Sequence, residues 1–259
     1  MRSFIARVCL VFLCLAVSPC AANAECLSRE QGDAILSELR QIRILLERQP
    51  RRPGLMQQVP GPQDPAIGEK VVLRLASDLS LGRPDAPVVI VEYTDYRCPA
   101  CAAFQAETFP RIRKNFIDTG KVRFIKRDLA QDAHPEALKA AQAGRCAGDQ
   151  GKFWEMHDLL SENPYGPGPE GYARFARELS LDTRAFQACV GGDSHLAEIR
   201  ASGQGAAAIG IRSTPSFVIG TARGDVLEGI GITGAQPYAV FEKAITDFLG
   251  RKTGIPGTD

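Results

Sequence analysis

The sequence predicts an α/β fold that contains a helical insertion and is preceded by a separate N-terminal helix. An apolar β-branched run, a helical stretch and a second apolar run follow one another over residues 88–128. A strand, a helix and a strand joined by short connections favour a parallel βαβ unit. Helical patterns then occupy about residues 132–208, and strand patterns return at 215–229 before a closing helix at 235–249. We therefore expect one α/β domain interrupted by helices.

The composition is that of an ordinary globular protein. Of the 259 residues, 44% are hydrophobic and 24% are charged. A chain of this length can bury one sizeable core, or one core plus a small appendage. The formal net charge is +1, with basic and acidic residues interleaved, and no glycine-rich phosphate loop is present in the sequence. We expect neither a nucleic-acid partner nor a cofactor.

Residues 1–24 have the three parts of a secretory signal peptide. Arg2 and Arg7 precede an apolar run over 8–17, and a small-residue site ending at Ala24 follows. The run is short for a membrane-spanning helix, so a membrane anchor is the less favoured alternative. We expect cleavage after Ala24 and an oxidising location such as the periplasm, where disulfides persist.

Five of the eight encoded cysteines remain after such a cleavage: Cys26, Cys98, Cys101, Cys146 and Cys189. An odd number means that at least one cysteine is free or pairs between chains. Cys26 lies next to the cleavage site, and an interchain bridge is one role open to it.

A helix with a narrow apolar seam is predicted within residues 25–49. The seam residues are four, three and four positions apart, the spacing of a coiled coil: Ile35, Leu39, Ile42 and Leu46. In this register Glu38 and Arg43 could pair across a parallel interface. We expect a homo-oligomer through residues 27–48. Two heptads are marginal for a free coiled coil, so packing of the helix on its own domain is the alternative.

A linker rich in proline follows over 50–67 and separates this helix from a domain at 68–250, after which a tail occupies 251–259. Within the domain, strands are predicted at 71–75, 88–93, 121–128, 215–219 and 226–229. Helices are predicted from the first domain cysteines to about residue 117, with a kink at Pro110, and at 135–147, 153–160, 172–179, 182–189, 193–208 and 235–249. Asp182 is a candidate N-cap.

Cys98 and Cys101 form a Cys-x-x-Cys motif where the strand at 88–93 meets the next helix. Free N–H groups at a helix start stabilise a Cys98 thiolate, and Pro99 fits the first turn. Cys101, one turn further on, faces Cys98 from a more buried position. We predict a redox-active dithiol/disulfide in which Cys98 attacks and Cys101 resolves the mixed disulfide.

A zinc half-site and an inert structural bridge are the alternatives for this motif. Structural zinc takes four ligands, and the sequence has no second Cys-x-x-Cys and no paired histidines. We expect no metal site. The histidines, which are interpreted as surface or packing residues, are His134, His157 and His195.

Thr214 and Pro215 precede a strand and form a candidate cis peptide bond. In that conformation the Thr214 backbone could make β-like hydrogen bonds to an extended substrate beside the Cys98 sulfur.

Glu92 and Lys126 interrupt two apolar strands that are predicted to be neighbours. A buried pair beneath the dithiol could move protons to and from Cys101. Strand-edge charges in solvent are the alternative.

Three stretches resemble the DsbA-like thiol:disulfide oxidoreductases: Val-Glu-Tyr-Thr-Asp-Tyr-Arg-Cys-Pro-Ala-Cys, Arg-Cys-Ala-Gly-Asp-Gln-Gly-Lys-Phe-Trp-Glu-Met-His and Ser-Thr-Pro-Ser-Phe-Val-Ile-Gly. The resemblance covers about residues 68–250 and implies a thioredoxin fold with a helical insertion at about 132–208. It also implies a nucleophile, a resolving thiol and a cis-proline at Cys98, Cys101 and Pro215. Glu92 matches the family's buried acid, and Lys126 matches its lysine less closely.

The chain departs from DsbA itself at three points. DsbA has a histidine inside its Cys-x-x-Cys where this chain has Ala100, which predicts a less oxidising centre. Thr214 resembles the isomerase members DsbC and DsbG, and the N-terminal helix with its linker is similar to those of the oligomeric isomerases and of ScsC.

We therefore expect an extracytoplasmic thiol:disulfide oxidoreductase that forms, isomerises or reduces disulfides in secreted clients and exchanges electrons with a membrane redox partner. A non-catalytic holdase, or a Cu(I)-binding protein that uses the same cysteines, is the alternative. Cys146 and Cys189 lie on two insertion helices and are interpreted as a structural disulfide, with two buried free thiols as the alternative.

Overall fold

The structure is a computed structural model that describes residues 29–48, 67–75, 79–130, 135–167 and 171–250. The predicted signal peptide, Cys26, His134 and the tail at 251–259 lie outside the described residues, as does nearly all of the predicted linker. The chain divides into two units, residues 1–58 and residues 59–259, and each is described by itself.

Helix α1 (Arg29–Arg48) is the described part of the first unit. Its side chains are described over residues 31–41, and three large apolar ones are about half exposed there: Ile35, Leu36 and Leu39. The predicted helix is present, and it presents apolar side chains to solvent. The remaining seam positions, Ile42 and Leu46, lie outside the described side chains, and self-association through this helix stays a prediction.

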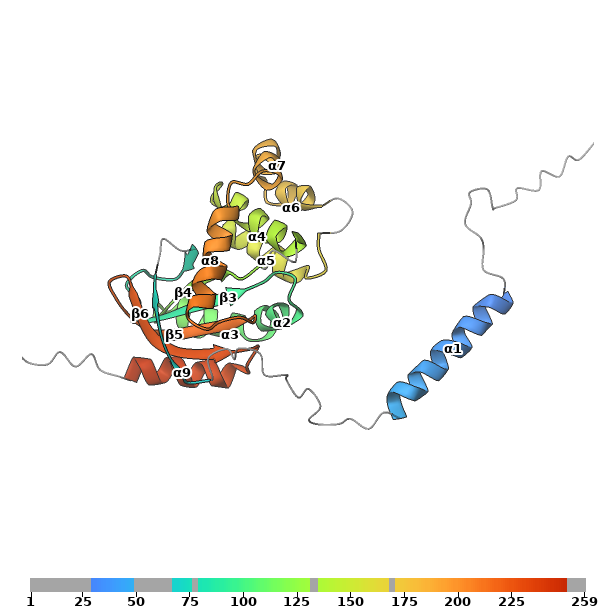
Figure 1. Ribbon diagram of the computed structural model, residues 1–259, viewed down its shortest axis with the longest axis horizontal. Helices are drawn as coiled ribbons and strands as arrows, with labels where there is room; N and C mark the ends of the chain where they lie inside the picture. The colour runs from blue at the N-terminus through green and yellow to red at the C-terminus, as the bar shows by residue number, and fades with distance from the viewer. Residues whose placement is uncertain (1–28, 49–66, 76–78, 131–134, 168–170, 251–259) are drawn as a thin grey trace, which may run out of the picture. The chain divides into compact units, whose positions relative to one another are not determined.

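A six-stranded mixed sheet forms the centre of the second unit, in the order β1-β6-β5-β3-β4-β2 (Figure 1). The strands are β1 (Lys70–Arg74), β2 (Leu79–Leu81), β3 (Val88–Thr94), β4 (Val122–Asp128), β5 (Ser216–Arg223) and β6 (Val226–Thr233). β3 and β4 are parallel, which confirms the predicted βαβ unit, and the other pairs are antiparallel. Every residue of β3 is buried, Glu92 included, as expected for a strand at the centre of a sheet that is covered on both faces.

Strand β2 was not predicted from the sequence. It is only three residues long and pairs with β4 at the edge of the sheet. Such a segment is too short to show a period-two pattern, and it becomes a strand because β4 offers it an edge.

Helices cover both faces of the sheet. On one face lie α2 (Pro99–Glu107), α3 (Phe109–Ile112) and α9 (Tyr238–Gly250). At the centre of this contact, Phe104 of α2 and Phe241 of α9 pack on Phe217 of β5, with ring centroids 4.5–5.3 Å apart. On the other face lies the end of α8 (Leu196–Ala208), where Ala206 packs with β-strand residues such as Val91.

The expected kink at Pro110 is a break between two helices. α2 ends at Thr108, and Pro110 lies in the first turn of α3, where a missing N–H costs no hydrogen bond. A π-helical turn, η1 (Arg113–Ile117), then completes the segment.

The insertion is helical, as predicted. It begins with α4 (Pro135–Gly148), α5 (Phe153–Glu162), α6 (Tyr172–Glu178) and α7 (Thr183–Gly191), and α8 leads the chain back to the sheet. Asp182 caps α7, because its carboxylate accepts from the N–H groups of Arg184 and Ala185, each at 3.0 Å. The core of the insertion includes Met156 and Phe175.

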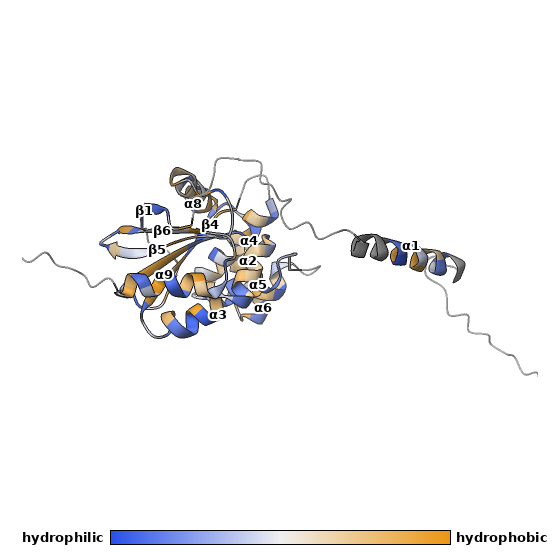
Figure 2. Cartoon of the chain, turned by 90° about the horizontal axis from the view of Figure 1, so that it is seen from below, coloured by the Kyte–Doolittle hydropathy of each residue, from blue (hydrophilic) through white to orange (hydrophobic). Residues whose placement is uncertain are grey.

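The hydropathy of the elements follows this architecture. Figure 2 shows the central strands as predominantly hydrophobic, whereas α9 has both hydrophilic and hydrophobic residues along its surface. In the described residues, no helix has both the length and the apolar character needed to cross a membrane.

Candidate active site

Cys98 lies at the junction of β3 and α2, as the N-cap residue of that helix. A turn built by Asp95 places it there: the Asp95 side chain accepts from the Arg97 N–H at 2.7 Å, and its carbonyl accepts from the Cys98 N–H at 3.1 Å. Cys98 is partly exposed and Cys101 is buried, and both are free thiols in the structure. This is the arrangement predicted for an attacking and a resolving cysteine.

The two thiols have opposite acidities. A hydrogen bond from the Cys101 thiol is the main cause that lowers the pKa of Cys98 to about 5. The Thr214 side chain and the backbone N–H groups at the start of α2 add to this effect, while burial opposes it. The same Cys98–Cys101 hydrogen bond, together with burial and the negative charge of Glu92, raises the pKa of Cys101 far above its usual value. At neutral pH the pair therefore holds a thiolate at Cys98 and a proton on Cys101.

Thr214 and Pro215 lie beside Cys98, although more than a hundred residues separate them in sequence. The Thr214–Pro215 peptide bond is cis. In its thiol form, Cys98 Sγ donates to the Thr214 carbonyl oxygen at 3.4 Å. Pro215 is buried, and its carbonyl accepts from the N–H of Gly234 at 2.8 Å, which ties this loop to the end of β6.

Glu92 and Lys126 lie directly opposite each other on the parallel strands β3 and β4. Their side chains are almost completely buried, at 0% and 1% exposure, with Nζ and Oε2 3.5 Å apart. The alternative of strand-edge charges in solvent is therefore wrong. Lys126 Nζ also lies 4.9 Å from the centre of the Tyr96 ring, and it has no hydrogen-bond partner in the described part of the chain.

Comparison with known proteins assigns the fold around these residues. The profile of the thioredoxin family matches residues 75–245, which is more than half of the chain. The chain belongs to the thioredoxin family. Alpha-DsbA1 from Wolbachia pipientis has a similar structure, with a TM-score of 0.61 and 26% identity, and the match covers 69% of this chain and 94% of that one. The predicted resemblance to DsbA-like proteins is thus confirmed.

Two curated relatives match shorter stretches of this thioredoxin-family chain. Disulfide bond formation protein D of Bacillus subtilis is 39% identical over 83 residues, which cover 32% of this chain and 37% of that protein. The Na(+)/H(+) antiporter NhaA 3 of Salinispora tropica is 38% identical over 145 residues, which cover 53% of this chain and 21% of the antiporter. The chain therefore spans well under two thirds of the length of either relative.

Two residues of the thioredoxin site were not predicted from the sequence. Gln105 Nε2 lies 3.2 Å and 3.4 Å from the two carboxylate oxygens of Glu92, to which it donates. Gln105 is four residues after Cys101 on α2, so helical spacing from the motif would have found it. Tyr96, the second residue, lies inside the turn before Cys98, and its sequence position gives no sign that its ring faces Lys126.

The two described histidines lie on the helical insertion, His157 in α5 and His195 at the start of α8. His157 is completely buried among aromatic rings, including those of Phe109, Phe153 and Trp154, and burial holds its pKa well below the usual range. It is a neutral packing residue. His195 is partly buried in the insertion and contacts Asp149.

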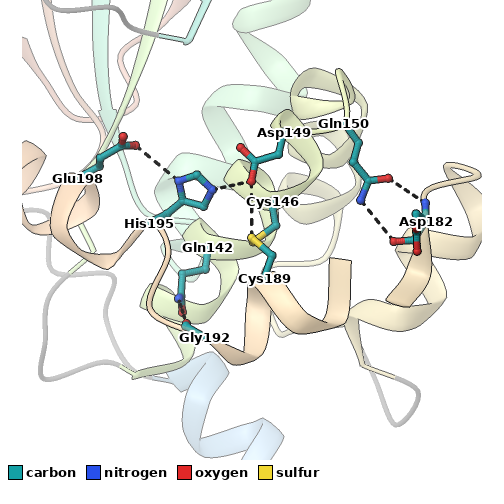
Figure 3. The surroundings of a disulfide bond; sticks show 9 residues. All are labelled: Gln142, Cys146, Asp149, Gln150, Asp182, Cys189, Gly192, His195 and Glu198. Atoms are coloured by element: carbon teal, nitrogen blue, oxygen red, sulfur yellow. Dashed lines mark hydrogen bonds and ion pairs between the residues drawn. A yellow bond between two sulfur atoms is a disulfide. The ribbon is translucent and has the colours of Figure 1, made fainter. Parts of the chain in front are cut away.

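The insertion of the thioredoxin domain contains a disulfide between Cys146 on α4 and Cys189 on α7 (Figure 3). Their Cα atoms are 5.8 Å apart, within the range that a disulfide spans. Cys146 is buried and Cys189 is partly exposed. This is the pairing interpreted from the sequence as structural.

Proposed function

We propose that the chain is an extracytoplasmic thiol:disulfide oxidoreductase in which Cys98 is the nucleophile and Cys101 the resolving thiol. The observation that carries this proposal is the opposite acidity of the two thiols. Cys98 is partly exposed with a pKa of about 5, whereas Cys101 is buried and protonated. A thiolate is the species that attacks a disulfide, and only an accessible one can reach a protein client.

The exchange proceeds in two displacements. The Cys98 thiolate attacks one sulfur of a client disulfide, which forms a mixed disulfide and releases the other client sulfur as a thiolate. Cys101 then loses its proton and attacks Cys98 Sγ, which releases the second client thiolate and closes the Cys98–Cys101 disulfide. Two electrons pass to the client. The same steps in reverse order oxidise a client dithiol. If a different client thiol attacks the mixed disulfide, the client forms a new disulfide and is thereby isomerised.

Glu92 and Lys126 are proposed to handle the Cys101 proton. When Cys98 becomes part of a mixed disulfide, Cys101 loses the acceptor of its hydrogen bond and must release its proton before it can attack. Glu92 is a buried carboxylate whose charge already acts on Cys101, and Lys126 lies 3.5 Å from it. Gln105 holds the Glu92 carboxylate through both of its oxygens and so positions it.

Thr214 is proposed to hold the client. The Thr214 backbone flanks Cys98. An extended client segment can hydrogen-bond to this backbone as an added strand, which places the client sulfur opposite Cys98 Sγ. This mode of binding uses the client main chain, and it suits an enzyme that accepts many secreted proteins.

The location, partners and assembly belong to the same proposal. A periplasmic site is supported by the signal-like sequence at 1–24 and by the named relatives that form disulfides. Secreted proteins are the proposed clients. After each exchange, a membrane redox partner would return the Cys98–Cys101 pair to its starting dithiol or disulfide state. The exposed apolar side chains of α1 support homo-oligomerisation through residues 27–48, which would bring two sites to one client and favour isomerisation.

The test of the chemistry is insulin reduction and client holding by the mature chain and its Cys98→Ser variant. We expect the variant to lose insulin reduction and to keep any suppression of client aggregation. If Cys98→Ser left reduction intact, the assignment of the nucleophile would be wrong. If it abolished holding alone, the holdase or Cu(I)-binding alternative would be favoured.

The direction of exchange is tested separately with scrambled and with reduced ribonuclease, using the mature chain and a variant without residues 25–50. We expect truncation to convert an oligomer to a monomer in light scattering and to remove isomerisation of scrambled ribonuclease. Oxidation of reduced ribonuclease should persist, since each domain retains its dithiol. A monomeric mature chain would overturn the oligomer proposal.

A further inference from the structure

A second group of sulfur, nitrogen and oxygen atoms gathers beside the insertion disulfide, away from Cys98. The two sulfur atoms of Cys146 and Cys189 and a ring nitrogen of His195 all lie within 4.8 Å of one another. Asp149 joins them: its Oδ2 is 2.9 Å from His195 Nε2 and 3.7 Å from Cys189 Sγ (Figure 3). Two cysteines, a histidine and a carboxylate are a donor set that zinc takes in proteins.

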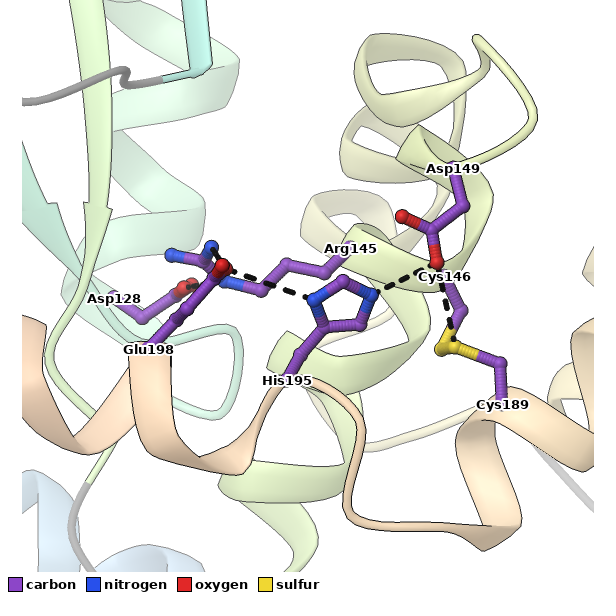
Figure 4. Close-up of polar contacts among 7 residues, drawn as sticks. All are labelled: Asp128, Arg145, Cys146, Asp149, Cys189, His195 and Glu198. Atoms are coloured by element: carbon purple, nitrogen blue, oxygen red, sulfur yellow. Dashed lines mark hydrogen bonds and ion pairs between the residues drawn. A yellow bond between two sulfur atoms is a disulfide. The ribbon is translucent and has the colours of Figure 1, made fainter.

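The ring of His195 is oriented by a carboxylate on the side opposite the sulfur atoms. His195 Nδ1 faces Glu198 Oε2 at 3.6 Å, while Nε2 points towards Asp149 and the sulfur atoms (Figure 4). Glu198 is itself held by Arg145 at 2.6 Å, and Arg145 is anchored on Asp128 at 2.7 Å. A carboxylate behind one ring nitrogen fixes the ring and increases the basicity of the other nitrogen, as around zinc-bound histidines.

We propose that reduction of the Cys146–Cys189 disulfide opens a zinc site made of these two sulfurs, His195 Nε2 and Asp149 Oδ2. A thiol or phosphine reductant supplies two electrons and breaks the S–S bond, giving two thiols. Zn²⁺ then binds both sulfurs as thiolates and releases two protons, while the proton that His195 Nε2 donates to Asp149 moves to Nδ1, which faces Glu198. The disulfide form lacks thiolates and does not bind the ion.

The spacing fits this proposal with small movements. In a tetrahedral site with Zn–S of about 2.3 Å and Zn–N and Zn–O of about 2.0 Å, the ligand atoms are roughly 3.3–3.8 Å apart. The sulfurs must separate from bonding distance, and His195 Nε2 and Asp149 Oδ2 must move apart slightly from 2.9 Å. The ring nitrogen is already within 4.8 Å of both sulfurs. The ion can enter from solvent, because the Asp149 side chain is 54% exposed.

A zinc ion at this position would replace the covalent disulfide link between two helices by a metal-mediated link. The disulfide joins α4 to α7, and the zinc site would join the same two helices and add the start of α8 through His195. The insertion would then stay assembled in its reduced form. This proposal is independent of the function proposed for Cys98, since none of its ligands belongs to that centre.

The experiment is cobalt and zinc titration of the mature chain, residues 25–259, with Cys26, Cys98 and Cys101 replaced by serine so that only the insertion cysteines remain. The disulfide form and a phosphine-reduced form are compared. We expect Co²⁺ to give thiolate-to-cobalt charge-transfer absorption with one equivalent bound in the reduced form, zinc to displace it, and the disulfide form to give no such band.

Matched variants identify the ligands. His195→Ala in the same reduced background should weaken zinc binding by at least about tenfold, and Glu198→Gln by about tenfold through the histidine. Glu155→Gln removes an exposed carboxylate outside the cluster and should leave affinity unchanged. Absence of the charge-transfer band, or equal affinity in His195→Ala, would overturn the proposal. So would loss of helical circular dichroism on reduction that zinc fails to restore.

Discussion

The two cysteine pairs of this domain differ in how far apart they lie in sequence and in what surrounds them. Cys98 and Cys101 are one helical turn apart at a strand–helix junction, whereas Cys146 and Cys189 are separated by 43 residues on two helices. In the chain-entropy account, closing the longer loop stabilises the fold by about 4 kcal/mol, and closing the short loop by about 2 kcal/mol. The long-range pair is therefore the harder one to open.

The surroundings add to this difference. The helix start and the neighbouring thiol favour a thiolate at Cys98, which stabilises the reduced state of the first pair. Beside the second pair lie a carboxylate and a histidine, Asp149 and His195, in a partly solvated position. In this domain, sequence distance and local charge, rather than residue type, therefore distinguish the exchanging pair from the bridging pair.

The largest expected effect is on turnover. Cys98→Ser and Cys101→Ser should each reduce client turnover to background, but only Cys101→Ser should accumulate a covalent adduct with a disulfide-containing client, because its mixed disulfide cannot be resolved. Non-reducing gels measure the adduct. A chain with Cys146→Ala and Cys189→Ala is the matched control and should still turn over. An adduct that accumulates with Cys98→Ser and not with Cys101→Ser would reverse the assigned roles.

The next largest effect is expected on stability, when the buried Glu92–Lys126 pair near Cys101 is broken. Lys126→Met leaves the Glu92 carboxylate buried without its cation and should lower the free energy of unfolding by about 3–5 kcal/mol. The double variant Glu92→Gln/Lys126→Met should recover part of this loss in urea denaturation. Glu92→Gln alone should also lower the pKa of Cys101, since the Glu92 charge raises it. If the pKa of Cys101 were unchanged in Glu92→Gln, the Glu92–Lys126 pair would have only a structural role.

Removal of the insertion disulfide is expected to have the third-largest effect, on the stability of the fold. The Cys146→Ala/Cys189→Ala chain should lose about 2–4 kcal/mol of unfolding free energy, because its unfolded state is no longer constrained by the long loop. The pH dependence of Cys98 alkylation should not change in this variant. If it did, the two pairs would be coupled and the contrast between them would fail.

The pH dependence of Cys98 reactivity separates the pairs without mutation. Its lowered pKa of about 5 means that the thiolate is lost as pH falls through 5 and is fully present above about 6. The rate of iodoacetamide alkylation should rise with a midpoint near pH 5, while Cys101 stays unreactive through neutral pH. A midpoint near that of an ordinary thiol, about 8.5, would contradict the low pKa.

The smallest effect is expected for Ala100→His, an exposed change inside the motif. A histidine here places a cation near the Cys98 thiolate below neutral pH, which should move the alkylation midpoint to lower pH and make the disulfide more oxidising. Equilibration with glutathione measures the potential. Ala100→Gln, which is neutral and of similar size, is the control and should leave the midpoint nearly unchanged.

Much of this protein follows from short-range sequence patterns. The order of every strand except β2, a disturbance of the helix at Pro110, the N-cap at Asp182 and the position of Cys98 at a helix start were predicted, because each depends on residues within a few positions of one another. The sequence also predicted that Glu92 and Lys126 lie on neighbouring strands, since two parallel strands joined by a helical crossover pair in a predictable way.

The contacts between segments that are distant in sequence could be read only from the folded structure. The sequence suggested that Thr214 lies beside Cys98, and the structure adds that its carbonyl oxygen is 3.4 Å from Cys98 Sγ. No local pattern shows that β2 adds an edge to the sheet, or that His195 and Asp149 meet at the insertion disulfide. These contacts depend on how segments that are distant in sequence pack together. The local pattern of residues around Cys98 and Cys101 was enough to place a dithiol at the start of a helix. The packing decided which carbonyl flanks it and which side chains gather around the other cysteines, because packing alone brings distant segments within reach of one another.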